Sequence, residues 1–153
     1  TDRRIFTAPE IFTPLTSVDF QNNNDPAFQS ILNFVPGSTF KDLTAEAVNN
    51  PDISAFIKKY RQFKTNPQNQ FINTETDTNA LGYRLLQSQK IKEAIEVFKL
   101  NVEAYPNSAN AYDSLGDGYS VKGDKVKAIA AYKKSIAINP NVEETLKKLK
   151  ALE

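Results

Sequence analysis

The stretch Ala80-Leu81-Gly82-Tyr83 returns 34 residues later as Ser114-Leu115-Gly116-Asp117, and this repetition decides the fold. Three further pairs keep the same spacing of 34: Ala94 with Ala128, Phe98 with Tyr132, and Pro106 with Pro140. Internal repetition at a fixed period of this length indicates stacked supersecondary units that share one continuous core. The sequence therefore predicts two copies of a helix hairpin, each ended by a proline.

The period, and the order of the Leu-Gly, small, aromatic and proline positions, resemble the tetratricopeptide repeat (TPR). The resemblance implies an all-α fold, a TPR-like helix-hairpin array with repeats at 75–108 and 109–142 and a C-terminal capping helix over about 142–152. Gly82 and Gly116 would let the first helix of each hairpin approach the second closely. A module of this kind presents a surface and rarely carries out chemistry, so we expect no enzymatic activity in this chain.

Helices are expected over about 76–88, 91–104, 109–122 and 125–138, with Gly123-Asp124 as a turn. Thr74-Glu75-Thr76-Asp77 has the spacing of a capping box at the start of the first repeat. Because two repeats fall short of the usual minimum of about three, residues 37–74 should supply helices that complete the core. One should begin at the capping-box sequence Thr39-Phe40-Lys41-Asp42, and the next carries an apolar stripe, namely Ile53, Phe56, Ile57, Tyr60 and Phe63.

Residues 1–36 read differently from the rest. Two β-prone stretches, Ile5-Phe6-Thr7 and Ile11-Phe12-Thr13, each lead to a proline, which predicts an extended N-terminal arm. Asp25-Pro26 has the pattern of a cap followed by proline and should open a short helix. The chain contains no Met, so we expect it to be a fragment or a processed product.

The composition excludes several classes of function. With 19 basic and 18 acidic residues the net charge is +1, which gives no electrostatic case for a nucleic-acid partner. No apolar run approaches the roughly 20 residues that a membrane-spanning helix needs. The chain has no Cys and no His, so the usual transition-metal sites and Cys–His or Ser–His–Asp catalysis are excluded, and no cofactor is expected.

A longer series of matches goes beyond the generic repeat. It comprises Tyr60-Arg61, residues 76–83, 94–102, 105–108 and 112–116. The series resembles the C-terminal TPR appendage of bacterial hydrolases, especially in the Bacteroidetes. Residues 8–16, 19–20 and 24–32 look like the end of a tail-specific (S41) serine peptidase domain, although Glu10 stands where Asp is more usual. The resemblance implies a periplasmic or secreted protein whose catalytic Ser and Lys lie upstream, so no catalytic residue is assigned here.

The candidate ligand-binding residues are those that the hairpin geometry places on the concave face of the array. They come from the first helix of each repeat: Asn79, Tyr83 and Leu86, then Asn110, Asp113, Asp117 and Ser120. The chaperone-type TPR groove grips a carboxylate with Lys, Asn and Arg at such places, whereas these positions offer two acids and no cation. Two acids would repel an anionic ligand. The alternative is that this face packs against a catalytic domain or faces solvent.

Two other patterns have structural explanations beside the functional ones. Asp113, Asp117 and Asp124 lack the spacing of a calcium loop, and Asp124 is better explained as a helix cap, so no metal site is expected. A basic strip formed by Lys58, Lys59, Arg61 and Lys64 could meet a partner or a membrane surface, but such a run is more typical of the solvated face of an amphipathic helix.

Taken together, the sequence predicts a non-catalytic module for protein–protein or intramolecular docking. Its partner would be a protein or peptide, or the catalytic domain of a larger exported hydrolase. The alternatives are a fragment that completes the fold or active site of that hydrolase, and a free-standing TPR adaptor. The oligomeric state and the identity of the ligand stay open.

Overall fold

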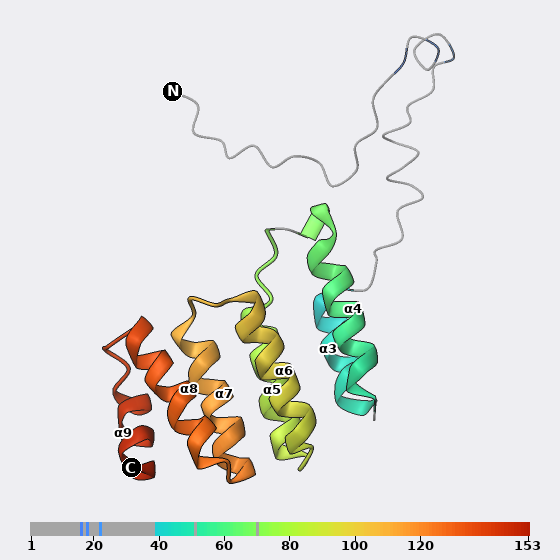
Figure 1. Cartoon of the computed structure of the whole chain (residues 1–153). Coiled ribbons are helices and arrows are strands. Elements are labelled where there is room, and N and C mark those ends of the chain that lie inside the picture. The colour runs from blue at the N-terminus through green and yellow to red at the C-terminus, as the bar shows by residue number, and fades with distance from the viewer. Residues whose placement is uncertain (1–15, 17, 19–21, 23–38, 51, 70) are drawn as a thin grey trace, which may run out of the picture. The chain divides into compact units, whose positions relative to one another are not determined.

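The structure is a computed structural model that describes residues 16, 18, 22, 39–50, 52–69 and 71–153 (Figure 1). Backbone contacts divide the chain into two compact units, Thr1–Gly37 and Ser38–Glu153. The predicted extended arm, the short helix after Asp25 and the peptidase-like segment fall in the first unit and, except for residues 16, 18 and 22, outside the described residues. All the labelled helices belong to the second unit.

The described part of the second unit is helical. It contains α3 (Phe40–Asn49), α4 (Ile53–Thr65), the 3₁₀ turn η1 (Pro67–Asn69), α5 (Glu75–Gln87), α6 (Ile91–Ala104), α7 (Ala109–Lys122), α8 (Lys125–Ile138) and α9 (Glu143–Leu152). No strand occurs among the described residues. The all-α prediction is confirmed, and the four repeat helices begin and end within one residue of their predicted bounds.

The helices pack as hairpins placed one after another. Each of α3, α5 and α7 packs against the helix that follows it, and successive hairpins meet through α3 with α5 and through α6 with α7 (Figure 1). The last helix, α9, packs on α8. The first helices of the two repeat hairpins, α5 and α7, also contact each other directly.

Side-chain caps explain where several helices begin. At α3 the Thr39 hydroxyl accepts from the Asp42 amide (3.3 Å) and the Asp42 carboxylate accepts from the Thr39 amide (2.7 Å), which confirms the predicted capping box. Ser108 caps α7 by accepting from the Ala111 amide at 3.1 Å. The Asp124 carboxylate caps α8 through the Lys127 amide at 3.2 Å, as predicted.

The predicted capping box at the start of α5 is wrong. Thr74 is the N-cap residue, but its side chain makes no cap hydrogen bond. Its hydroxyl lies instead 3.2 Å from the Tyr60 hydroxyl and 3.0 Å from the Tyr105 hydroxyl, and its amide donates to Tyr105 at 2.7 Å. Thr74 is fully buried, so its hydroxyl joins α4 to the end of α6 rather than serving its own helix.

Gly82 and Gly116 have the close contacts that the sequence predicts. A Cβ atom on Gly82 would lie 2.3 Å from the ring of Phe98, and one on Gly116 would lie 2.4 Å from the ring of Tyr132. Each aromatic ring of a second helix therefore packs directly on the glycine of the first helix in its own hairpin. The Phe98 ring also reaches the next hairpin, since a Cβ on Gly118 would meet it at 3.0 Å.

The helices before the repeats complete the core with aromatic side chains. Phe40 of α3 lies 5.6 Å from Tyr60 and 6.3 Å from Phe56, both on α4, measured between ring centroids. These buried rings belong to the same apolar cluster as Leu81 and Leu85 of α5. The first hairpin thus covers the apolar side of α5 that would otherwise face water.

The two repeat hairpins turn at equivalent residues with different amino acids. Gly123 ends α7 with a φ of 80°, and Gln89, 34 residues earlier, has a φ of 61° between α5 and α6. A positive φ strains any residue that carries a Cβ atom. We expect Gln89→Gly to raise the free energy of unfolding by about 0.5–1 kcal/mol in urea denaturation.

The matched change is Gly123→Ala, which introduces the strain that Gln89 already bears. It should lower the free energy of unfolding by about 1 kcal/mol. A destabilising Gln89→Gly substitution would show that the backbone at this turn gains more from a side chain than it loses to strain.

Candidate concave-face site

The structure places the seven predicted concave-face residues on α5 and α7. One pocket is lined by Tyr83, Leu86, Asp117 and Ser120. Asp113 does not line it but forms an ion pair with Lys148, which does. Asn79 and Asn110 do not line this pocket. The seven side chains therefore divide into two groups, and their role in ligand binding stays a prediction.

Asp117 is the hub of this face. Its Oδ1 accepts from the Tyr132 hydroxyl at 2.7 Å, and its Oδ2 accepts from the Tyr83 hydroxyl at 2.8 Å. The Tyr83 hydroxyl also lies 3.1 Å from Ser114 Oγ. Because Tyr83 belongs to α5, Asp117 to α7 and Tyr132 to α8, one carboxylate joins three helices.

A cation that sequence reasoning did not place on this face comes from α9. Lys148 Nζ donates to Asp117 Oδ2 at 2.8 Å and to Asp113 Oδ2 at 2.9 Å, and its ammonium lies 5.8 Å from the centroid of the Tyr132 ring. Thr145, also on α9, donates to Asp113 Oδ1 at 2.8 Å. Lys148 therefore adds one cation from α9 to the two acids of α7, and one negative charge remains uncompensated within the cluster.

The pocket beside this cluster has a volume of about 470 Å³. Besides the four predicted residues it is lined by Val121, Tyr132, Lys148, Ala151 and Leu152. Val121 is 54% exposed and Leu86 is 9% exposed, so an apolar wall borders the charged hub. A pocket of this kind suits an apolar side chain that is flanked by polar groups.

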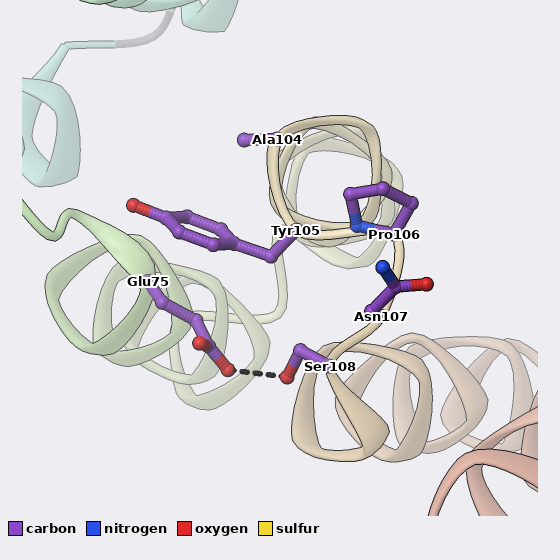
Figure 2. Close-up of a pocket in the computed structure, with 6 residues that line it drawn as sticks. All are labelled: Glu75, Ala104, Tyr105, Pro106, Asn107 and Ser108. Carbon is purple, nitrogen blue, oxygen red and sulfur yellow. Dashed lines mark hydrogen bonds between the residues drawn. The ribbon is translucent and has the colours of Figure 1, made fainter. Parts of the chain in front are cut away.

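The other end of the face is a second, polar pocket, also of about 470 Å³ (Figure 2). Glu75 at the start of α5 faces Ser108 across it, and the Ser108 hydroxyl donates to the Glu75 carboxylate at 2.5 Å. Asn110 Nδ2 donates to the same carboxylate at 3.3 Å. The polar groups here satisfy one another, so the predicted role of Asn110 in ligand binding would compete with its contact to Glu75.

The architecture resembles proteins already known. No protein-family model matches the sequence. Over 63 residues the chain is 30% identical to the tetratricopeptide repeat domain-containing protein PYG7, chloroplastic, of Arabidopsis thaliana. This aligned stretch covers 41% of this chain and 21% of that protein. The crystal structure of MamA matches with a TM-score of 0.50 and 23% identity, over 76% of this chain and 64% of that chain.

The fold is TPR-like. The TPR-like period explains how Lys148 reaches its partners, because Lys148 lies 34 residues after Ser114, just as Leu149 lies 34 after Leu115 and Leu115 lies 34 after Leu81. All three leucines are buried. The helix α9 therefore occupies the place of a first helix in a further repeat, and Lys148 contacts Asp117 as Ser114 contacts Tyr83 one period earlier.

Burial and neighbouring charges shift the pKa values of Tyr83, Tyr132 and Lys148 on this face. Burial raises the pKa of Tyr83 to about 12, and the neighbouring Asp117 carboxylate acts in the same direction. Burial and the hydrogen bond to Asp117 also raise the pKa of Tyr132. For Lys148, burial alone lowers the pKa, but the hydrogen bonds to Asp117 and Asp113 outweigh it and raise the pKa above its usual value.

These shifts predict how stability changes at alkaline pH. An unfolded tyrosine loses its proton near pH 10, whereas folded Tyr83 keeps it to about pH 12. The contribution of Tyr83 to folding is thus complete below about pH 10 and is lost as the pH rises toward 12. Urea midpoints measured across this range should fall less steeply for Tyr83→Phe than for the wild type.

Absorbance of tyrosinate offers an independent check on the same prediction. The chain has 6 tyrosines, and those with raised pKa values should ionise only with alkaline unfolding. Ionisation of every tyrosine near pH 10 in the folded protein would contradict the burial of these hydroxyls.

The basic strip on α4 is largely paired. Lys59 forms an ion pair with Glu46 at 2.8 Å and Arg61 with Glu103 at 3.4 Å, while Lys64 lies 5.1 Å from the centroid of the Tyr105 ring. Within the described part of the chain, no group of three or more acidic residues gathers as a metal site would require. No helix in that part is long and apolar enough to cross a membrane.

Proposed function

We propose that this TPR-like chain is a non-catalytic docking module that binds a protein or peptide segment on its concave face. The observation that carries the proposal is the pocket where Tyr83, Leu86, Asp117 and Ser120 meet. It is built on four helices, because Asp117 of α7 is hydrogen-bonded to side chains of α5, α8 and α9, so the surface is formed before a ligand arrives. Preformed surfaces lose little conformational entropy on binding.

The chemistry of the pocket favours a partner with an apolar anchor. Leu86, Val121 and Leu152 offer apolar contacts. The lysine at the site is already shared between two carboxylates, and the cluster keeps a net charge of −1 from Asp113, Asp117 and Lys148. A free carboxylate would meet that charge, so an uncharged or basic segment with one apolar side chain fits better than an acidic terminus.

A matched pair of surface substitutions tests this proposal. Val121 is 54% exposed in the pocket wall, whereas Val126 is 79% exposed and does not line the pocket. Peptides enriched from a phage-displayed library on the wild-type protein should lose about tenfold or more in affinity with Val121→Asp, because a buried unpaired charge costs more than one factor of ten. Val126→Asp should bind them as the wild type does.

Two results would contradict docking at this pocket. The first is a library that yields no peptide binding above background. The second is equal binding by the two aspartate variants, which would place the contact elsewhere on the array.

We further propose that the module is the C-terminal TPR region of a larger exported bacterial hydrolase such as an S41 peptidase. Residues 8–32 support this through their resemblance to the end of such a domain. Docking could then be intramolecular, against the catalytic domain of the parent, and the protein would be periplasmic or secreted. The chain covers only 21% of the PYG7 protein and 64% of MamA, so these relatives leave the wider context open.

Reading the complete open reading frame tests this second proposal. An upstream hydrolase domain with a serine nucleophile would support an appendage, or a fragment that helps to complete the active site. An open reading frame with little else than this segment would support a free-standing adaptor and overturn the hydrolase proposal.

A further inference from the structure

A second groove lies away from the concave-face pocket and shares no lining residue with it. Its volume is about 420 Å³. It is built from the start of α4, the outer side of α6, the last turn of α7 and the first turn of α8. Its lining residues are Ile53, Lys92, Glu93, Ile95, Glu96, Lys99, Tyr119, Lys122 and Lys127.

The rim of this groove is positively charged. Four lysines and two glutamates line it, and Asp124, the ion-pair partner of Lys127, lowers the formal charge from +2 to +1. Lys99 is paired with Glu96 at 2.7 Å and Lys127 with Asp124 at 3.0 Å. Lys92 and Lys122 form no ion pair within the described part of the chain, so both ammonium groups are available to an anionic ligand.

The floor of the groove is apolar. Ile95 is 3% exposed, and a Cβ on Gly118 would lie 3.1 Å from it, so α6 and α7 approach closely beneath the groove. Tyr119 forms one side, with the Lys127 ammonium 5.5 Å from the centroid of its ring. Lysines thus stand around a recessed apolar floor.

We propose that this groove binds an acidic segment of a partner protein. Carboxylates of the segment would pair with Lys92 and Lys122, and one apolar side chain would lie against Ile95 and Tyr119. The concave-face cluster has a net negative charge and this groove a positive one, so the two surfaces select partners of opposite charge. An extended chain fits better than a flat lipid surface, because the apolar contacts are recessed behind the lysines.

The test uses a fluorescein-labelled synthetic peptide of sequence Glu-Glu-Leu-Glu-Glu and measures fluorescence anisotropy. We expect the Lys92→Glu, Lys122→Glu double variant to bind at least about tenfold more weakly than the wild type, because like charges at a contact repel the ligand. Wild-type binding should also weaken as salt is raised, since exposed charges are screened. Circular dichroism and the urea midpoint establish that the variant is folded.

The matched control reverses the same charge at two lysines outside the groove. Lys58 on α4 and Lys150 on α9 are both exposed and have no ion pair within the described residues. The Lys58→Glu, Lys150→Glu variant has the same net charge as the groove variant and should keep its affinity within about twofold, because distant surface charges are screened.

Three results would overturn the proposal. One is an absence of peptide binding by the wild type. Another is an equal loss in both double variants, which would indicate attraction by net charge alone. The third is binding of the wild type to vesicles of anionic phospholipid but not to the peptide, which would assign the lysines to a lipid surface.

Discussion

Replacing Phe98 by alanine should lower the free energy of unfolding by about 3–5 kcal/mol, the range for removing a buried aromatic side chain. The Phe98 side chain is fully buried. Its ring packs on Gly82 of its own hairpin and on Gly118 of the next, and its centroid lies 5.2 Å from that of Tyr83. Two glycine backbones cannot move to fill the space, so the cavity would persist. Urea denaturation followed by circular dichroism measures the loss.

Phe71 is the matched control, because it is 90% exposed in the loop before α5. Phe71→Ala should change the free energy of unfolding by less than about 0.5 kcal/mol, as is usual for surface substitutions. A similar small effect of Phe98→Ala would mean that the hairpins are not held together by this ring.

Replacing Asp117 by alanine is the second change with a large expected effect. It removes the acceptor for two tyrosine hydroxyls and one ammonium group at once. The Asp117 side chain is 20% exposed and that of Lys148 is 30% exposed, so water replaces only part of the lost interaction. We expect the free energy of unfolding to fall by about 2–3 kcal/mol.

A double-mutant cycle separates the ion pair from the rest of the network. Asp117→Ala combined with Lys148→Met should lower the free energy of unfolding by less than the sum of the two single changes. The reason is that each single change leaves one charged partner of this ion pair behind, whereas the double variant removes both. Glu103→Ala is the control, since its pair with Arg61 is exposed and should contribute less than about 1 kcal/mol. Strict additivity in the cycle would show that Lys148 and Asp117 do not interact in solution.

The repeat period predicted most of the helical part of the fold. It located α6, α7 and α8 at their observed bounds, because the spacing of Gly, Ala, aromatic and Pro residues reports directly on how the helices of a hairpin pack. Capping signals at Thr39 and Asp124 are local and depend on two or three neighbouring residues. Such local rules can be applied to the sequence without knowing the tertiary structure.

The features that the sequence did not predict all depend on contacts between distant residues. The hydroxyl of Thr74 is drawn away from its helix by Tyr60 and Tyr105, which lie 14 and 31 residues away. The sequence predicts Lys148 only as a polar residue of the capping helix. It becomes part of the site because α9 places its ammonium group against Asp117, 31 residues away. Gly118 has Arg84 as its counterpart one period earlier, so repetition gave no reason to single it out.

The position of the Phe98 ring also determines how the array exchanges its amide protons. Opening either of the two hairpins that the ring contacts would expose it, so the hydrogen bonds of α6 break only when a large part of the array opens together. The helix α9 packs on α8 at one end, and 10 residues form a marginal helix on their own. Protection against deuterium should therefore be greatest in the middle of the array and decline toward α9, so that solvent enters from the C-terminal end.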